Sequence, residues 1–446
     1  MKLVSTRGGE TASLDEALVR GLAGDGGLFV PAELPAFAPD AFAEAGDIAA
    51  TARILLAPFF TGSRLADALD DIVQETFSFA LPLVKLPVSP GSAWMLELFH
   101  GPTAAFKDIG AAFLAACLSR LERGCAGAPL TILVATSGDT GGAVAGAFDG
   151  RPGVRVVVLY PENRVSERQR HQLTCWGHNV LSLAVHGSFD DCQALVKQAM
   201  GDAALKARFR FSSANSINVG RLLPQCTYYA HAALARYRAS GSKPGFIVPT
   251  GNLGNGLACI MARRMALPIG DIVLATNANR PIPDFLESGE WRPRPSIATL
   301  ASAMDVGAPS NMERLLELGG DPDTLRRDIR ACSVSDAEIE AAIAEDYRDF
   351  GFATCPHTAT GTHTYRRLDE AERRATEWIL VATAHAAKFE QIVEPLIRRT
   401  VPLPDALRDI LSRPVRSLAI EPRLKSLIAA IEAHRRLDAE RSAGDK

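Results

Sequence analysis

Two glycine-rich turns are the features of this sequence best suited to bind a ligand. In VATSGDTGGAVAGAF a strand-like run leads through Ser137 to Gly142 into a helix of small residues, and FIVPTGNLGNGLACI repeats this order around Gly251 and Gly254. Backbone N–H groups at a helix N-terminus bind anions, and glycine lets the chain turn tightly there. The pattern predicts two anion sites and a ligand with separated charges, although each turn alone also fits a tight connection that binds nothing.

One lysine could supply covalent chemistry. Lys107 lies in ELFHGPTAAFKDIGAAFLAACL, between an apolar turn and an apolar helix of small residues. Removal from water disfavours the ammonium, so we expect a lowered pKa, and a neutral lysine amine forms an imine with a carbonyl group. The spacing by itself favours a different interpretation, a lysine that extends from a helix end into solvent beside Asp108.

The elements that carry these residues read as an α/β protein. From about residue 130 the runs TILVA, VRVVVLY, FIVPT, DIVLAT and WILVAT alternate with helical patterns, which predicts parallel sheets covered on both faces. Residues 1–92 have helical patterns and no such turn, and ASGSKPG interrupts the pattern near residue 240. We therefore predict an N-terminal unit at 1–92 and two further units at 93–240 and 241–446.

Composition sets limits on function. The chain of 446 residues is 47% hydrophobic and carries a net charge of -3, so it should form several globular domains and should not bind nucleic acid. The N-terminus turns polar after four residues and no run is long enough to span a bilayer, which predicts a cytoplasmic protein with no membrane contact. Eight cysteines without a CxxC pair argue against a disulfide framework, and most should be buried.

Other candidate sites are weaker. His171, Cys175 and His178 have a spacing that could place three zinc ligands on a helix, but no fourth ligand follows, so we predict no metal. His100 could line a pocket, although a satisfied core histidine is the preferred interpretation. Neither glycine-rich turn matches GxGxxG with a following acidic residue or GxxxxGK[ST], which disfavours dinucleotides and magnesium nucleotides.

Taken together, the motifs resemble those of one enzyme family. HGPTAAFKD, SGDTGG, NSINVGRLLPQ, GNLGN and PHTATG stand in the order found in the threonine synthase family, and STRG and DGGLFVPAELP resemble its N-terminus. The resemblance covers nearly the whole chain. It implies a fold-type-II pyridoxal-phosphate enzyme, similar to the tryptophan synthase β chain, with two α/β domains of parallel-rich sheets and an N-terminal unit. It places the lysine in the smaller domain, 93–240, and the cofactor phosphate in the larger one, 241–446.

The resemblance also implies roles for individual residues. Lys107 matches the lysine that forms the Schiff base with the cofactor, and Thr358 matches the hydroxyl that meets the pyridine nitrogen. The cradle for the cofactor phosphate corresponds to Gly251, Asn252, Leu253, Gly254 and Asn255. The loop for the substrate carboxylate corresponds to Ser137, Gly138, Asp139 and Thr140, and the group for the substrate phosphate to Asn215, Ser216 and Arg221. Arginine suits phosphate because its planar donors match the oxygens.

Three residues depart from the family's pattern. Cys355 and Thr360 stand where an acidic and an aliphatic residue are expected, and Ala386 stands where proline is usual. They concern the loops around Thr358 and His385 and leave the lysine and both glycine-rich turns unchanged.

The implied reaction converts O-phospho-L-homoserine and water to L-threonine and phosphate, the last step of threonine biosynthesis, in a monomer or homodimer. Lys107 would move most of the protons. Two alternatives remain at this point: a related phospho-lyase that releases 2-oxobutyrate, and a non-catalytic relative that binds a phosphorylated amino acid.

Overall fold

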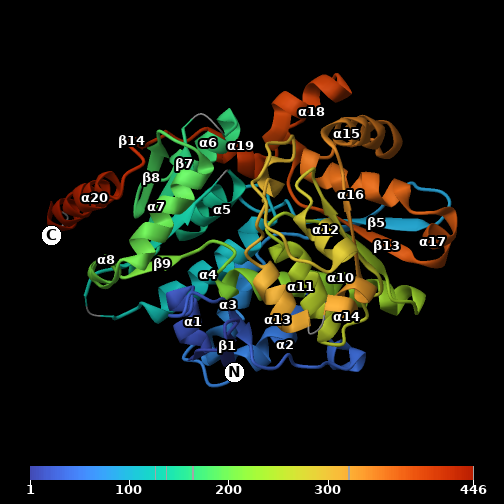
Figure 1. The fold of residues 1–446 in the computed structure, drawn as a ribbon, viewed down its shortest axis with the longest axis horizontal. Helices are drawn as coiled ribbons and strands as arrows, with labels where there is room; N and C mark the ends of the chain where they lie inside the picture. The colour runs from blue at the N-terminus through green and yellow to red at the C-terminus, as the bar shows by residue number, and fades with distance from the viewer. Residues whose placement is uncertain (126, 137, 163–164, 320–321, 445–446) are drawn as a thin grey trace.

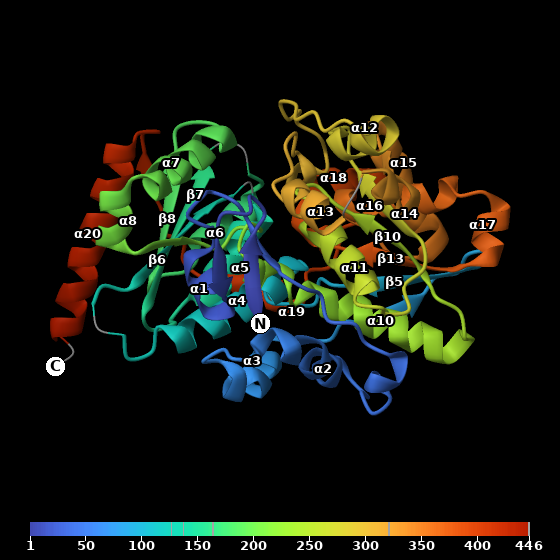
Figure 2. The same ribbon diagram turned by 60° about the horizontal axis from the view of Figure 1, so that its bottom comes forward.

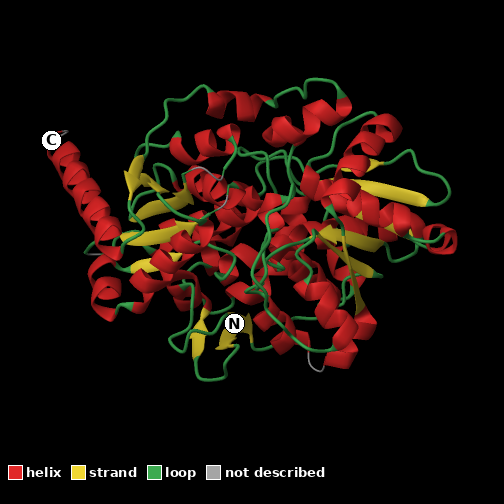
Figure 3. Ribbon diagram, turned by 45° about the horizontal axis from the view of Figure 1, so that its top comes forward, coloured by secondary structure: helices red, strands yellow, loops and turns green. Residues whose placement is uncertain are grey.

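The computed structural model describes the whole chain except residues 126, 137, 163–164, 320–321 and 445–446, and describes only the backbone of 437–444. Figure 1 shows two groups of strands side by side, with the N-terminal elements below them. In Figure 3 helices surround the strands of each group on both faces. The predicted α/β architecture is confirmed.

The N-terminal unit contains a small antiparallel sheet of order β2-β1-β3. Its elements are β1 (Lys2–Ser5), β2 (Thr11–Ser13), α1 (Leu14–Arg20), β3 (Phe29–Pro31), α2 (Ile48–Phe60) and α3 (Leu69–Thr76), with short 3₁₀ helices η1 (Pro39–Phe42) and η2 (Ala66–Ala68). The start of α1 is fixed by a capping box, in which Ser13 and Glu16 satisfy each other's backbone N–H groups. Figure 2 shows α2 and α3 below the junction of the two larger sheets.

A six-stranded sheet has the order β12-β11-β10-β13-β5-β4 and is parallel except for the β4–β5 pair. Its strands are β4 (Leu83–Lys85), β5 (Ser92–Glu97), β10 (Gly245–Pro249), β11 (Ile272–Thr276), β12 (Ile329–Ser333) and β13 (Glu377–Ala382). The runs FIVPT, DIVLAT and WILVAT supply β10, β11 and β13, as predicted. Every residue of β10 and β11 is buried, as expected for a parallel sheet covered on both faces.

A five-stranded parallel sheet has the order β14-β8-β7-β6-β9. It comprises β6 (Leu130–Ala135), β7 (Val154–Pro161), β8 (Val180–Val185), β9 (Phe211–Ser213) and β14 (Leu418–Ile420). The runs TILVA and VRVVVLY form β6 and β7, as predicted.

Helices pack on both sheets. Those of the first half are α4 (Lys107–Leu121), α5 (Asp139–Phe148), α6 (Glu167–Thr174), α7 (Phe189–Gly201), α8 (Ala203–Phe209), α9 (Val219–Leu222) and α10 (Gln225–Ser240). Those of the second half are α11 (Gly254–Arg264), α12 (Pro281–Ser288), η3 (Ser302–Met304), α13 (Met312–Gly319), α14 (Pro322–Asp328), α15 (Asp336–Phe350), α16 (Pro356–Arg367), α17 (Glu370–Ala375), η4 (Ala386–Phe389), α18 (Glu390–Ile397), α19 (Asp405–Leu411) and α20 (Leu424–Gly444).

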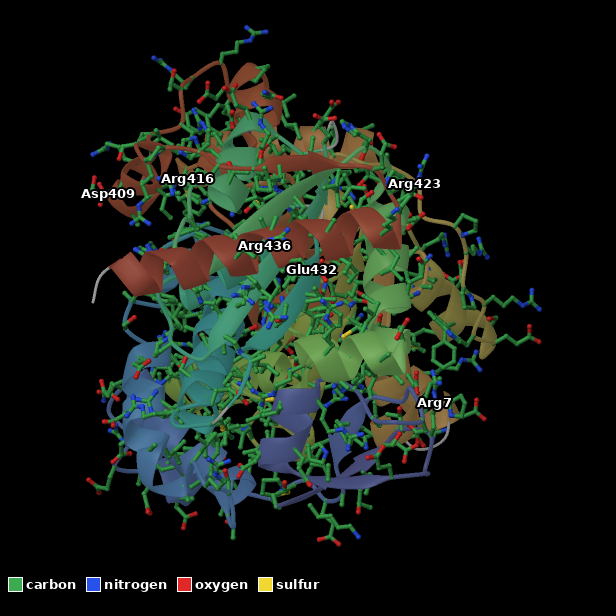
Figure 4. All side chains as sticks on the ribbon, turned by 90° about the vertical axis from the view of Figure 1, so that its left-hand side faces the viewer. Arg7, Asp409, Arg416, Arg423, Glu432 and Arg436 are labelled. Carbon is green, nitrogen blue, oxygen red and sulfur yellow. The ribbon has the colours of Figure 1, made fainter. Side chains whose placement is uncertain are left out.

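Sheet membership departs from the predicted boundaries at 92 and 240. Strand β5, on the N-terminal side of Lys107, belongs to the six-stranded sheet, whereas β14 joins β8 of the five-stranded sheet. Helix α20 follows β14 and crosses the side of the molecule that Figure 4 shows. There Glu432 of α20 forms an ion pair with Arg208 of α8. Short strands carry no local signal of the sheet they join, because that depends on long-range packing. The three-unit division stays a prediction.

Candidate active site

One cavity of about 490 Å³ lies between the two sheets, at the carboxyl ends of their strands. Ala135 of β6, Ser213 of β9 and Pro249 of β10 all line it. Open parallel sheets bind ligands at this edge because their loops and helix N-termini converge there. Of the predicted residues the cavity brings together Lys107, Asp139, Thr140, Asn215, Ser216, Arg221 and the whole segment 251–255. Gly138 and Thr358 do not line it, and Ser137 lies outside the described residues.

The turn after β10 has the form of an anion cradle. Leu253 adopts a left-handed conformation (φ 62°) at the N-cap of α11. None of the five N–H groups of residues 251–255 donates to an acceptor within the described part of the chain. Gly251 is required here, because an added Cβ would lie 2.6 Å from the Met304 Cα. Free amides at the start of an 11-residue helix suit a phosphate group.

The Asn255 side chain forms hydrogen bonds within the protein. Its Oδ1 accepts hydrogen bonds from the hydroxyls of Tyr228 and Tyr229, each at 2.7 Å, and its Nδ2 donates to the Pro249 carbonyl at 3.3 Å. The side chain therefore fixes the turn to the buried helix α10.

The turn after β6 forms a second group of free amides. Gly138 has φ 147°, and an added Cβ would lie 2.6 Å from Gln169 Nε2. Thr136 Oγ1 accepts hydrogen bonds from the N–H groups of Gly138 (3.0 Å) and Gly141 (2.9 Å). The N–H groups of Asp139 and Thr140 find no acceptor among the described residues. These two amides at the start of α5 can bind a carboxylate.

Lys107 is the first residue of α4, and its side chain reaches the cavity. Burial lowers its pKa to about 8, the Asp139 carboxylate opposes this shift, and the cations of Arg221 and Lys388 add to it. The loop before it is held by β13, since Phe106 N–H donates to the Thr383 carbonyl at 2.8 Å. Lys107 therefore does not extend into solvent, and its amine is partly neutral near neutral pH.

A buried ion pair stands beside Lys107. Lys388 Nζ lies 2.8 Å from Asp139 Oδ1. Burial alone would raise the pKa of Asp139, but the charges of Lys388 and Lys107 hold it well below its ordinary value. His357 is uncharged, because burial lowers its pKa to about 4, and its Nε2 accepts the Ala303 N–H at 3.0 Å. Sequence reasoning missed Lys388, whose burial depends on contacts from distant segments.

Arg221 contributes a buried guanidinium to the cavity wall. Its Nη1 donates to the Ala214 carbonyl at 2.5 Å and its Nη2 to the Lys107 carbonyl at 3.4 Å, while Nε has no partner in the described part of the chain. Burial lowers its pKa to about 10, which leaves it charged. Nearby, Asn215 Nδ2 donates to the Ala135 carbonyl at 2.9 Å, and Ser216 Oγ accepts from the Asn252 amide.

Two threonines differ in what they offer a ligand. Thr358 is buried, and its Oγ1 accepts the Thr383 N–H at 3.2 Å and lies 3.3 Å from Cys355 Sγ. Thr383 lines the cavity, and its Oγ1 is buried with no partner among the described residues. The free hydroxyl is therefore that of Thr383, which sequence reasoning missed. The available signal was its place directly after the strand WILVA.

The departures in the PHTATG segment are accommodated. Cys355 is the N-cap of α16, where its Sγ accepts the Thr358 N–H at 3.4 Å in place of a side-chain oxygen. Thr360 is buried and its hydroxyl donates to the His357 carbonyl at 2.7 Å. Ala386 is a buried residue of η4.

The remaining histidine candidates have other partners. His171 Nε2 bonds the Ile410 carbonyl at 3.1 Å, and His178 Nδ1 lies 3.0 Å from Asp149. Within the described residues no group of His, Cys, Asp and Glu could hold a metal. His100 is exposed and pairs with Glu97 at 2.7 Å, so the prediction of a core histidine is wrong. No helix in the described ranges is long and apolar enough to span a membrane.

Comparison with known proteins agrees with this geometry. Residues 80–383 match the family model for pyridoxal-phosphate dependent enzymes, and residues 2–77 and 358–431 match the models for the N-terminus and C-terminus of threonine synthase. A threonine synthase of Serratia marcescens is 39% identical over 402 residues, which are 89% of this chain and 91% of the relative. The chain belongs to the threonine synthase family.

Solved structures of this family share the fold. Threonine synthase from Escherichia coli has a TM-score of 0.86 at 35% identity and covers 97% of this chain and 100% of its own. The pyridoxal-phosphate-bound enzyme from Brucella melitensis has a TM-score of 0.87 at 34% identity, with coverage of 97% and 98%. The chain therefore has the fold-type-II architecture and the function of its family: it is a pyridoxal-phosphate-dependent carbon–oxygen lyase of threonine biosynthesis.

The cavity fits this cofactor on three observations. The five free amides of 251–255 match a phosphate, and Lys107 has the lowered pKa that a covalent attachment needs. The unpartnered hydroxyl of Thr383 offers a hydrogen bond to a polar ring atom. All three line the same cavity.

Proposed function

We propose that the chain converts O-phospho-L-homoserine and water to L-threonine and phosphate in this cavity, with Lys107 as the cofactor-bearing lysine and the proton carrier. The observation that supports the proposal best is that one cavity unites a lysine of lowered pKa with two separate sets of free backbone amides. The substrate and the cofactor both carry anionic groups, which such amides bind.

The cofactor would be held from three sides. The amides of Gly251, Asn252, Leu253, Gly254 and Asn255 would bind its phosphate, and Lys107 would bind it covalently. Thr383 would offer its hydroxyl to the ring nitrogen, and Thr358, the residue predicted for that contact, would fix Thr383 by accepting its N–H. When bound, pyridoxal phosphate supplies a ring that accepts electrons from the carbon next to the substrate amine.

The substrate would be held at both ends. Its carboxylate would meet the N–H groups of Asp139 and Thr140 at the start of α5, while the Asp139 side chain stays bound to Lys388. Its phosphate would meet the guanidinium of Arg221, with Asn215 and Ser216 beside it. A guanidinium and helix amides at opposite ends align a doubly anionic substrate, which orients its middle carbons toward Lys107.

Once the substrate amine has released it from the cofactor, Lys107 Nζ would accept the proton from the α-carbon and return protons later in the cycle. A pKa of about 8 suits this work, because an amine close to the working pH can both take and give a proton. Arg221 would stabilise the charge on the departing phosphate.

The test uses two measurements on the purified protein and on Lys107→Ala. The wild-type protein should show the visible band of a lysine–cofactor adduct and release phosphate and threonine from O-phosphohomoserine, and the variant should lose both. Release of 2-oxobutyrate in place of threonine would support the related lyase. Binding without turnover would support the non-catalytic relative, and a protein that cannot take up the cofactor would contradict the assignment.

The setting of the reaction is also a proposal. We infer a cytoplasmic monomer or homodimer that binds a small-molecule substrate and no nucleic acid. The free state of all eight cysteines fits a reducing compartment, and the small net charge fits the absence of a polyanionic partner. We also propose that the two α/β units close on the substrate, which unchanged unit positions in a substrate-analogue complex would contradict.

A further inference from the structure

Lys388 is a completely buried lysine outside the cavity wall. It lies in η4, and its side chain has no exposed surface. Its Nζ lies 2.8 Å from Asp139 Oδ1 and donates to the Thr103 carbonyl at 2.7 Å. Burial of an ammonium is costly unless it is paired, so its position requires the Asp139 carboxylate.

These contacts join three segments of the chain beside the cavity. Thr103 precedes Lys107 by four residues, Asp139 begins α5, and Lys388 follows β13. Gln172 Nε2 also donates to the Thr103 carbonyl (3.1 Å), and Gln169 Nε2 donates to Asp139 Oδ1 (3.2 Å). Both glutamines are neutral, so Lys388 is the one cation in contact with Asp139 within the described part of the chain.

The titratable groups around Lys107 come from five elements. Asp139 of α5 is the anion that favours its ammonium, and Arg221 of α9 and Lys388 of η4 are the cations that oppose it. His357 of α16 is neutral. Asp108, the next residue of α4, is engaged by Thr103, whose N–H and hydroxyl donate to its carboxylate at 2.9 Å and 2.5 Å.

We propose that Lys388 is a positioning residue paired with Asp139: it fixes this carboxylate in place and offsets its charge, so that the Lys107 amine can lose its proton. This builds on the proposed role of Lys107 but concerns a property of the lysine that exists without the cofactor. Asp139 without Lys388 would be an unpaired buried anion, which draws a proton onto Lys107. Lys388 without Asp139 would be an unpaired cation, which repels that proton.

The experiment measures the titration of Lys107 in the full chain without cofactor. Reductive alkylation with a small aldehyde is followed against pH by mass spectrometry of the peptide that contains Lys107. The exposed Lys243 serves as an internal reference in every sample, and Lys107→Ala gives the blank. The wild-type midpoint should lie near the pKa of about 8, well below the value of 10.5 for a free lysine.

The variants should shift this midpoint in opposite directions. Lys388→Met should raise it by on the order of one pH unit, Asp139→Asn should lower it, and the double variant should return close to wild type. A merely structural loss would move the midpoints of both single variants the same way. If Lys388→Met does not fold, the titration midpoint of Lys107 in the double variant must still lie above the midpoint in Asp139→Asn.

Three results would overturn the proposal. They are an unchanged midpoint in Lys388→Met, equal midpoints in Asp139→Asn and the double variant, and a double variant that stays where Lys388→Met lies. None of these depends on catalysis, so a failure of the proposed reaction, seen as an absent cofactor band, remains distinguishable from a failure of this proposal.

Discussion

Replacement of Thr383 by valine should stabilise the cofactor-free protein and weaken cofactor binding at the same time. The hydroxyl of Thr383 is buried and has no partner among the described residues, so the free protein bears its desolvation cost. Valine has nearly the same shape and lacks the polar atom. The bound cofactor would lose one hydrogen-bond partner in the variant.

The expected changes in the free energy of unfolding and in the Kd can be estimated from the hydrogen bonding of the Thr383 hydroxyl without and with the cofactor. An unsatisfied buried hydroxyl costs about 1–3 kcal/mol, so Thr383→Val should raise the free energy of unfolding by about 1 kcal/mol. Loss of a hydrogen bond of about 0.5–1.5 kcal/mol should raise the Kd for the cofactor by about 2- to 10-fold. Thr358→Val is the matched control, because its hydroxyl accepts the buried Thr383 N–H at 3.2 Å. This variant should lose about 1–3 kcal/mol of stability.

The assays are urea unfolding of the cofactor-free proteins and absorbance titration with pyridoxal phosphate. Opposite signs of the stability change in the two valine variants, with weaker cofactor binding in Thr383→Val, would support the assignment. Equal destabilisation of both variants, or an unchanged Kd in Thr383→Val, would refute the reasoning that the free hydroxyl belongs to Thr383.

Three further predictions concern the same cavity. Gly251→Ala should weaken cofactor binding at least about 10-fold, because its Cβ would lie 2.6 Å from the Met304 backbone. Gly254→Ala meets no protein atom nearer than 3.6 Å, so it should weaken binding less than Gly251→Ala in the same titration. The pKa of His357 is lowered to about 4, so below about pH 6.5 the unfolded chain takes up a proton that the folded chain refuses. The free energy of unfolding should therefore fall by up to about 3 kcal/mol between about pH 6.5 and pH 4. Urea unfolding of His357→Gln should show a smaller fall over this range. The same dependence on pH in the wild-type protein and the variant would contradict this prediction. Arg221→Met should raise the KM for O-phosphohomoserine at least about 10-fold with the cofactor spectrum unchanged, and an unchanged KM would remove Arg221 from the phosphate site.

The sequence predicted several strands, but it did not predict which sheet every strand joins. The runs that form β6, β7, β10, β11 and β13 were predictable, because each is a short apolar, β-branched segment followed by a turn. The joining of β5 to β13 and of β14 to β8 was not, since these pairs connect segments more than 230 residues apart in the chain. Only packing of the complete chain decides such partners.

The sequence by itself determined the chemistry that could be built locally. The turn at 138–142 needs glycine for its backbone, and the turn at 251–255 needs Gly251 because its backbone approaches Met304 closely. Both turns place amides at helix N-termini, and Lys107 begins a helix of small apolar residues. Only the tertiary structure decided which groups are free and which are paired. It freed the hydroxyl of Thr383, engaged that of Thr358, and buried Lys388 against Asp139. Hydrogen bonds and desolvation depend on neighbours from distant segments, and no local pattern specifies them.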